Sequence, residues 1–176
     1  MNNRPLVTRY QGNPILTKHD IPYPVETVHN AAATKFEGHY ILLFRSHLHN
    51  GRSIIGIARS DDGYDFDVDT EPFMVPSTEP AFLKFEEYGV EDPRICFMDG
   101  AYYITYSAYS QHGVRIGLAR TTDFQSVERV ALITQADYRN TVLFPGMRVL
   151  EHRDNVIPVD SEPGQTIGCQ EKAHPF

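Results

Sequence analysis

Two adjacent carboxylates and an arginine stand together in the run Glu91-Asp92-Pro93-Arg94, just before an apolar, strand-like stretch. Pro93 restricts Asp92 to extended backbone geometry, and Gly89 and Pro93 interrupt regular structure. A turn of this kind would hold one carboxyl group in a fixed direction, as a proton donor for glycosidic cleavage requires. The alternative is a solvated acidic turn with a surface salt bridge.

The composition is that of an ordinary globular chain. It has 176 residues, of which 41% are hydrophobic and 22% charged, enough for one domain with a core. The net charge of -7 argues against general nucleic-acid binding, which shows a basic footprint. No apolar run has the length of a membrane span, and residues 1–5 lack an apolar signal segment. We therefore expect a cytoplasmic protein with neither nucleic-acid nor membrane partners.

Neither the cysteines nor the histidines predict a metal site. Cys96 and Cys169 are far apart and match no ligand spacing, so we expect reduced thiols rather than a disulfide. The eight histidines form no ligand pattern. His47 and His49 are close in sequence, but a polar hairpin tip explains them more simply. We expect no metal and no organic cofactor.

The chain contains an internal repeat. Residues 38–46 align with residues 100–108 at an offset of 62, and residues 55–62 align with residues 116–123 at an offset of 61. Self-similarity over this distance is typical of folds built from repeated sheet units.

Each repeat predicts a strand, a tight turn, a second strand, a longer loop and a third strand. Asp99-Gly100 lies between two apolar runs, which is a strong hairpin signal. Residues 102–106 are rich in aromatic and β-branched side chains, as strands prefer. No segment shows helical periodicity over three turns. The sequence therefore predicts an all-β fold.

Repeated sheet units of this size favour a β-propeller, with a β-sandwich as the alternative. Asn30 and Asp92 begin equivalent strands, so both side chains would point toward one axial pocket. At this repeat length the chain holds fewer than three blades, whereas a closed ring takes roughly 250 residues. We therefore expect an open arc of two to three blades, either alone or paired with a second copy, because an open sheet edge invites self-association.

Several segments together resemble glycoside hydrolase family 130, the β-mannoside phosphorylases and related β-mannosidases. The resemblance extends over roughly residues 10–145, and the Glu-Asp-Pro-Arg block in this order with the others is its most specific part. Six segments carry the resemblance: residues 13–16, 30–32, 40–45, 57–63, 89–95 and 141–145.

The resemblance implies a five-bladed β-propeller and inverting phosphorolysis of β-mannosides to α-mannose 1-phosphate. Asp92 matches the catalytic general acid of the family, and the family mechanism that the resemblance implies passes the proton through a hydroxyl of the bound mannose to the glycosidic oxygen. Phosphate attacks the opposite face. Because phosphate is already an anionic nucleophile, no second carboxylate is needed to activate water. The implied partners are a β-mannoside oligosaccharide and inorganic phosphate as cosubstrate.

The resemblance also suggests residues that bind the substrates. Asn30 and Arg45 match positions that line the mannose subsite. Arg139 falls near a basic phosphate-binding position, and arginine suits phosphate through bidentate hydrogen bonds.

Two further arginines are candidates for the sugar site. Arg59 either lines the pocket or forms a surface or inter-blade ion pair. Arg94 lies close enough in sequence to orient Asp92 or Glu91 through an ion pair. A neighbouring cation favours the ionised carboxylate, so its effect must be offset if Asp92 is to hold a proton.

The chain departs from the family pattern after residue 145. Gly146-Met147-Arg148 stand where the family has an acidic residue and a lysine. We expect residues 1–150 to form the N-terminal blades and residues 151–176 an irregular tail, as in a fragment, a truncated product or a shifted frame. Three functions stay open: a β-mannoside phosphorylase, a β-mannoside hydrolase, and a noncatalytic carbohydrate-binding or interaction module.

Overall fold

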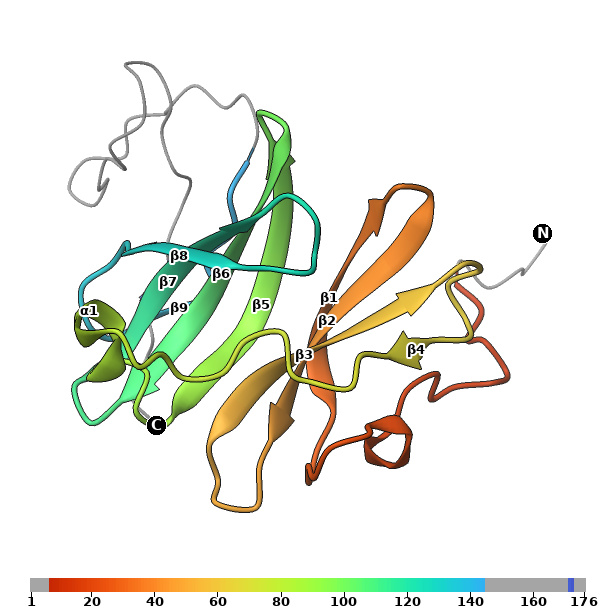
Figure 1. Ribbon diagram of the computed structural model, residues 1–176, viewed down its shortest axis with the longest axis horizontal. Helices are drawn as coiled ribbons and strands as arrows, with labels where there is room; N and C mark the ends of the chain where they lie inside the picture. The colour runs from red at the N-terminus through yellow and green to blue at the C-terminus, as the bar shows by residue number, and fades with distance from the viewer. Residues whose placement is uncertain (1–6, 145–170, 173–176) are drawn as a thin grey trace, which may run out of the picture.

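The computed structural model describes residues 7–144 and 171–172. Figure 1 shows two antiparallel β units side by side. The first β unit follows a short 3-10 helix (Lys18–Asp20). Its strands are β1 (His29–Phe36), β2 (His39–His47), β3 (Ser53–Ser60) and β4 (Asp67–Val68).

The second β unit follows one short helix, α1 (Pro80–Leu83). Its strands pair in chain order, and β9 pairs with β10 outside both units. The bounds are β5 (Gly89–Met98), β6 (Ala101–Ser110), β7 (Gly113–Thr121), β8 (Glu128–Leu132), β9 (Tyr138–Arg139) and β10 (Glu171–Lys172).

The repeat in the sequence is a repeat in the backbone. The β1–β2 turn at Glu37-Gly38 and the β5–β6 turn at Asp99-Gly100 each have two successive residues with positive φ. Such turns match the right-handed twist of the strands that they join. Both hairpins were expected from their turn residues.

A second repeated feature is a glycine beneath an aromatic ring. Phe44 is the cross-strand partner of Gly56, and Tyr106 is the cross-strand partner of Gly117. A Cβ atom on Gly56 would lie 2.3 Å from the Phe44 ring, and one on Gly117 would lie 2.2 Å from the Tyr106 ring. Only glycine leaves room for either ring.

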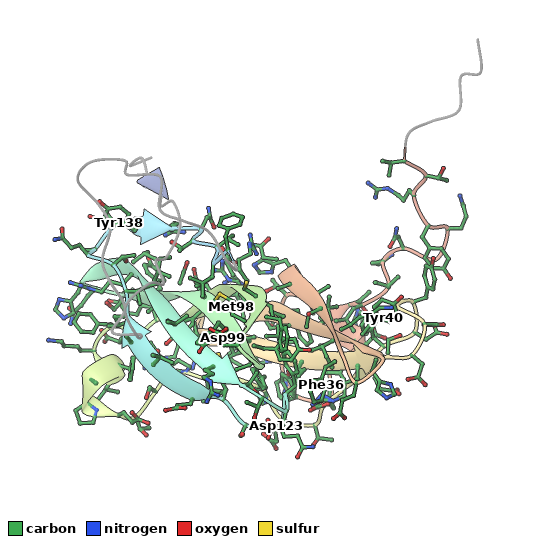
Figure 2. All side chains as sticks on the ribbon, turned by 90° about the horizontal axis from the view of Figure 1, so that it is seen from above. Phe36, Tyr40, Met98, Asp99, Asp123 and Tyr138 are labelled. Atoms are coloured by element: carbon green, nitrogen blue, oxygen red, sulfur yellow. The ribbon has the colours of Figure 1, made fainter. Side chains whose placement is uncertain are left out.

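The main core lies between the two β units. In Figure 1, β5 lies next to the first unit, and it contacts β1, β2 and β3. In Figure 2, Phe36 lies at this junction, where its ring contacts the rings of Tyr102 and Phe124. The fully buried apolar side chains of the junction include Ile41, Leu43, Ile55 and Ile57 from the first unit, and Val90, Ile104, Tyr106 and Ala108 from the second.

The predicted all-β class is confirmed. Within the described residues the sheet is open, with the order β1-β2-β3-β5-β6-β7-β8, and β4 pairs with β3. The five-bladed ring stays a prediction. The expected tail of residues 151–176 lies outside the described residues except for β10, and so does Gly146-Met147-Arg148. No helix in the described part of the chain is long and apolar enough to cross a membrane.

Candidate active site

Two equivalent β-bulges bring Asn30 and Asp92 together. The β1–β2 register shifts between His29 and Ala32, and the β5–β6 register shifts between Glu91 and Arg94. Within these bulges Asn30 has a φ of 49° and Asp92 a φ of 51°. The Nδ2 atom of Asn30 donates a hydrogen bond to Oδ1 of Asp92 at 2.8 Å. The two side chains therefore converge, as the repeat predicts, and the axial pocket that both would face stays a prediction.

The prediction of extended geometry for Asp92 is wrong, since its φ is positive. A bulge leaves one residue outside the hydrogen-bond ladder and re-aims its side chain. Asn and Asp tolerate the left-handed region better than most residues do. Asp92 and Pro93 therefore lie within the bulge, which turns the carboxylate toward the first unit.

Arg45 joins the two carboxylates of the second unit. Its guanidinium donates to Oδ1 of Asp92 at 3.2 Å and to Oε1 of Glu91 at 2.6 Å. The exposed fraction of the side chain is 14% for Arg45, 4% for Glu91 and 15% for Asp92. The shorter contact and deeper burial make Glu91 the main partner of Arg45, because water screens this pair little.

Glu91 is also held by the end of β3. Ser53 donates a hydrogen bond from its hydroxyl to Oε1 of Glu91 at 2.8 Å. Ser53 pairs with Gly89 where β3 meets β5, and a Cβ atom on Gly89 would lie 2.4 Å from the Ser53 nitrogen. Glycine at position 89 therefore permits the close approach that places Ser53 beside Glu91.

The two carboxylate oxygens of Asp92 have different surroundings. Oδ1 accepts hydrogen bonds from Asn30 and Arg45. Oδ2 accepts none from the residues that the structure describes. Since the bonded oxygen is fixed by two donors, Oδ2 is the atom on which a transferable proton would be carried.

Two histidines lie next to this cluster. His47 accepts from Arg45 through Nε2 at 2.9 Å, so its Nδ1 carries the proton and donates to the Thr27 hydroxyl at 3.0 Å. The ring centroids of His29 and His47 are 5.2 Å apart. Burial lowers the pKa of His29, and the nearby Arg45 lowers it further, more than Asp92 raises it.

The interpretation of His47 as part of a polar hairpin tip is therefore wrong. His47 ends β2 and contacts Arg45, whereas His49 is exposed and pairs with Glu26. The repeat held a signal for His29, which aligns with Glu91 just as Asn30 aligns with Asp92. Among the described residues, no group of three or more His, Cys, Asp or Glu side chains is arranged to hold a metal ion.

Arg94 does not orient the carboxylates. Its guanidinium donates to the Pro93 carbonyl at 3.0 Å, and in residues 7–144 the ion pairs of Glu91 and Asp92 are formed by Arg45. The bulge between Glu91 and Arg94 breaks the regular alternation of side chains along β5, so closeness in sequence does not bring Arg94 to the carboxylates.

The structure does not bring Arg59 or Arg139 to the cluster either. Arg59 lies near the end of β3 away from Ser53, where it donates to Asp69 at 3.2 Å and to the Phe124 carbonyl at 2.6 Å. It therefore links the two units. Arg139 is exposed in β9, opposite Glu171 of β10, and its contact with phosphate stays a prediction. A cavity is lined by residues 7–11, 13 and 14 rather than by the cluster.

Comparisons with known proteins identify the family of the chain. The family model described as beta-1,4-mannooligosaccharide phosphorylase matches residues 2–159. A 1,2-beta-oligomannan phosphorylase of Thermoanaerobacter sp. (strain X514) is 31% identical over 160 residues, which are 82% of this chain and 52% of the relative. A beta-1,2-mannobiose phosphorylase of Listeria innocua is 34% identical over 93 residues, which are 53% of this chain and 25% of the relative.

Solved structures show the same fold. The Listeria innocua beta-1,2-mannobiose phosphorylase, in complex with beta-1,2-mannobiose, superposes with a TM-score of 0.68 at 23% identity, covering 79% of this chain and 54% of that chain. A beta-fructofuranosidase of Bombyx mori superposes with a TM-score of 0.58 at 19% identity, covering 69% of this chain and 28% of that one. The chain thus spans about half the length, or less, of the relatives that it matches.

Proposed function

The chain belongs to glycoside hydrolase family 130, and from this premise we propose that it acts in the inverting phosphorolysis of β-mannosides to α-mannose 1-phosphate. Inorganic phosphate is the cosubstrate, Asp92 is the general acid, and Asn30 and Arg45 bind the mannose unit. The observation that carries the proposal is the arrangement of donors around Asp92. Asn30 and Arg45 fix Oδ1, while Oδ2 has no partner among the described residues.

The proposed reaction moves one proton in two short transfers. Asp92 gives the proton on Oδ2 to a hydroxyl of the bound mannose, and that hydroxyl gives its own proton to the glycosidic oxygen. The bond between C1 and the glycosidic oxygen breaks, and a phosphate oxygen forms a bond to C1 from the opposite face. The configuration at C1 is therefore inverted, and the leaving sugar departs as a neutral alcohol.

Glu91 makes this role of Asp92 compatible with the nearby Arg45. A lone guanidinium beside Asp92 would favour the carboxylate over the acid. Here Glu91 contacts Arg45 at 2.6 Å, closer than Asp92 does at 3.2 Å. With Asp92 protonated, the positive charge of Arg45 is neutralised by the negative charge of Glu91. The three side chains together then carry no net charge. Arg45 can then orient Asp92 without drawing away its proton.

Phosphate requires cationic donors. Arg139 is the residue that we propose for this contact, because its planar guanidinium can bind two phosphate oxygens at once. Its exposed position in β9 leaves it accessible to an anion.

The test supplies the full chain with β-1,2-mannobiose or β-1,4-mannobiose, with and without inorganic phosphate. We expect mannose 1-phosphate only when phosphate is present. Asp92→Asn should lower the rate by about 10²–10⁴-fold, as the loss of a general acid does. Asp67→Asn is the matched control, because Asp67 is exposed in β4, and it should leave the rate unchanged.

Other products would favour the other two functions. Free mannose formed at the same rate without phosphate would show hydrolysis instead. If the native chain and Asp92→Asn bind mannobiose equally and neither turns it over, the chain is a carbohydrate-binding module, and the proposed reaction is overturned.

A further inference from the structure

His29 lies beside the acid cluster, which consists of Asn30, Arg45, Glu91 and Asp92. Neither nitrogen of its imidazole ring has a hydrogen-bond partner among the described residues. Its neighbours are engaged: His47 bonds to Arg45 and Thr27, and Glu91 accepts from Arg45 and Ser53. His29 begins β1, directly before Asn30, and its cross-strand partner is Arg45. A half-buried polar ring in this place has both nitrogens available for a ligand.

The ring of His29 is supported by a side chain that is itself fixed. The His29 and His47 rings are tilted by 44°, and His47 is held by hydrogen bonds at both nitrogens. The His29 ring thus has a fixed neighbour, while part of its surface stays open to solvent. Such support reduces the entropy lost when a side chain binds a ligand.

The imidazole of His29 is neutral near pH 7. Burial lowers its pKa below the ordinary value of 6.5, and Arg45 and His47 act in the same direction against Asp92 and Glu91. A neutral imidazole has one N–H donor and one acceptor nitrogen. A sugar hydroxyl, which both donates and accepts, matches this pair better than a phosphate dianion, which would favour the cationic form.

We propose that His29 is a substrate-binding residue that contacts a hydroxyl of the hexose whose glycosidic oxygen receives the proton from Asp92. The inference rests on the proposed function and adds a contact to it. In the second unit the equivalent position is Glu91, which is buried and accepts hydrogen bonds from Arg45 and Ser53 through Oε1. The same backbone position thus holds a buried carboxylate in the second unit, at Glu91, and a ligand-binding imidazole in the first, at His29.

The test measures binding of β-1,2-mannobiose to the full chain by calorimetry without phosphate, so that no turnover occurs. His29→Phe keeps the ring against His47 but loses both polar atoms, and we expect binding about three- to tenfold weaker, as for one lost neutral hydrogen bond. His29→Asn should recover part of the loss. His39→Phe is the matched control: His39 lies at the far end of β2 from His47 and pairs with Asp61.

A second measurement does not depend on a variant. In the native chain, saturating sugar should shift the ring ¹⁵N resonances of His29 and leave those of His39 unmoved. If His29→Phe binds as the native chain does, or if the His29 signals do not shift although sugar is bound, the inference fails while the proposed function stands. If the native chain binds no mannobiose, both fail.

Discussion

The two β units have the same backbone and opposite chemistry at their inner strands. His29-Asn30 in β1 and Glu91-Asp92 in β5 stand 62 residues apart, each pair lies in a bulge, and Asn30 and Asp92 both have positive φ. The first unit places an imidazole and an amide there, and the second places two carboxylates. The amide can therefore donate to the carboxylate, whereas two carboxylates in contact would repel.

The two units also differ in the residues that pair with these positions on the neighbouring strands, β2 and β6. His29 pairs across the strands with Arg45, and Glu91 pairs with Ser107. The cation thus comes from the first unit and reaches across to the carboxylates of the second. The repeat supplies the geometry twice, and a few differences in residue type turn two equal positions into a donor side and an acceptor side.

The units also differ away from the site. Phe44 covers Gly56 in the first unit, and Tyr106 covers Gly117 in the second. The Tyr106 hydroxyl donates to the fully buried Glu86 at 2.7 Å. Burial raises the pKa of Tyr106, as does the Glu86 carboxylate, so the phenol stays protonated and donates. The second unit thus contains an internal charge that the first lacks at this position.

The largest effect is expected from removing that charge. Glu86 accepts two hydrogen bonds from Arg129, at 3.0 and 2.9 Å, and one from the Ser77 backbone at 2.8 Å. Glu86→Gln leaves a guanidinium that is only 13% exposed without its counter-ion. We expect the free energy of unfolding to fall by about 3–5 kcal/mol, measured by urea denaturation.

The matched control for this change is Glu128→Gln, at an exposed position of β8 in the same unit. It should alter the free energy of unfolding by less than about 0.5 kcal/mol. A loss below about 1 kcal/mol for Glu86→Gln would mean that the buried ion pair does not distinguish the two units.

The next largest effect tests whether the two units pack equally. An added methyl group would lie 2.3 Å from the Phe44 ring in Gly56→Ala and 2.2 Å from the Tyr106 ring in Gly117→Ala. Each ring must move, so each change should lower the free energy of unfolding by about 2–3 kcal/mol. Thermal or urea unfolding of both variants measures the two costs side by side.

Turn glycines provide the control for this pair. Gly38 and Gly100 have positive φ, but an added Cβ would meet nothing within 4 Å. Gly38→Ala and Gly100→Ala should therefore cost only the backbone term of about 1 kcal/mol. If only one of Gly56→Ala and Gly117→Ala exceeds this cost, the packing of the two units is not equivalent.

A smaller effect is expected when Tyr106 of the second unit is replaced by phenylalanine, the residue at the equivalent position 44 of the first unit. Tyr106→Phe keeps the ring over Gly117 and removes one hydrogen bond to the Glu86 carboxylate. The expected loss is about 1.5 kcal/mol in the free energy of unfolding, since the acceptor is charged. Tyr103→Phe is the control, because no hydrogen bond of the Tyr103 hydroxyl is found within residues 7–144. Equal losses in both variants would contradict the assigned role of the Tyr106 hydroxyl.

The sequence was sufficient for the features that depend on local residues or on the repeat. The two glycine turns have a local cause, because positive φ at Glu37-Gly38 and Asp99-Gly100 requires residues that tolerate it. The contact between Asn30 and Asp92 followed from the alignment of the two repeats.

The sequence was insufficient where a contact depends on long-range register. Arg94 was chosen because it is near Asp92 in sequence, but the cation at the carboxylates is Arg45, 47 residues before Asp92. The positive φ of Asp92 was missed for a similar reason, because a bulge is a property of two paired strands. A local rule for the residue before proline does not include that pairing.

The smallest expected effect concerns the imidazole of the first unit. Burial, Arg45 and His47 lower the pKa of His29, so its ring should titrate in the folded chain with a midpoint below 6.5, against about 6.5 in the chain unfolded in urea. Below about pH 6.5 the unfolded chain then binds more protons at this ring than the folded chain does, so the free energy of unfolding falls on acidification. A folded-state midpoint at or above 6.5, measured from the ring resonances, would mean that the carboxylates of the second unit outweigh burial and the cation.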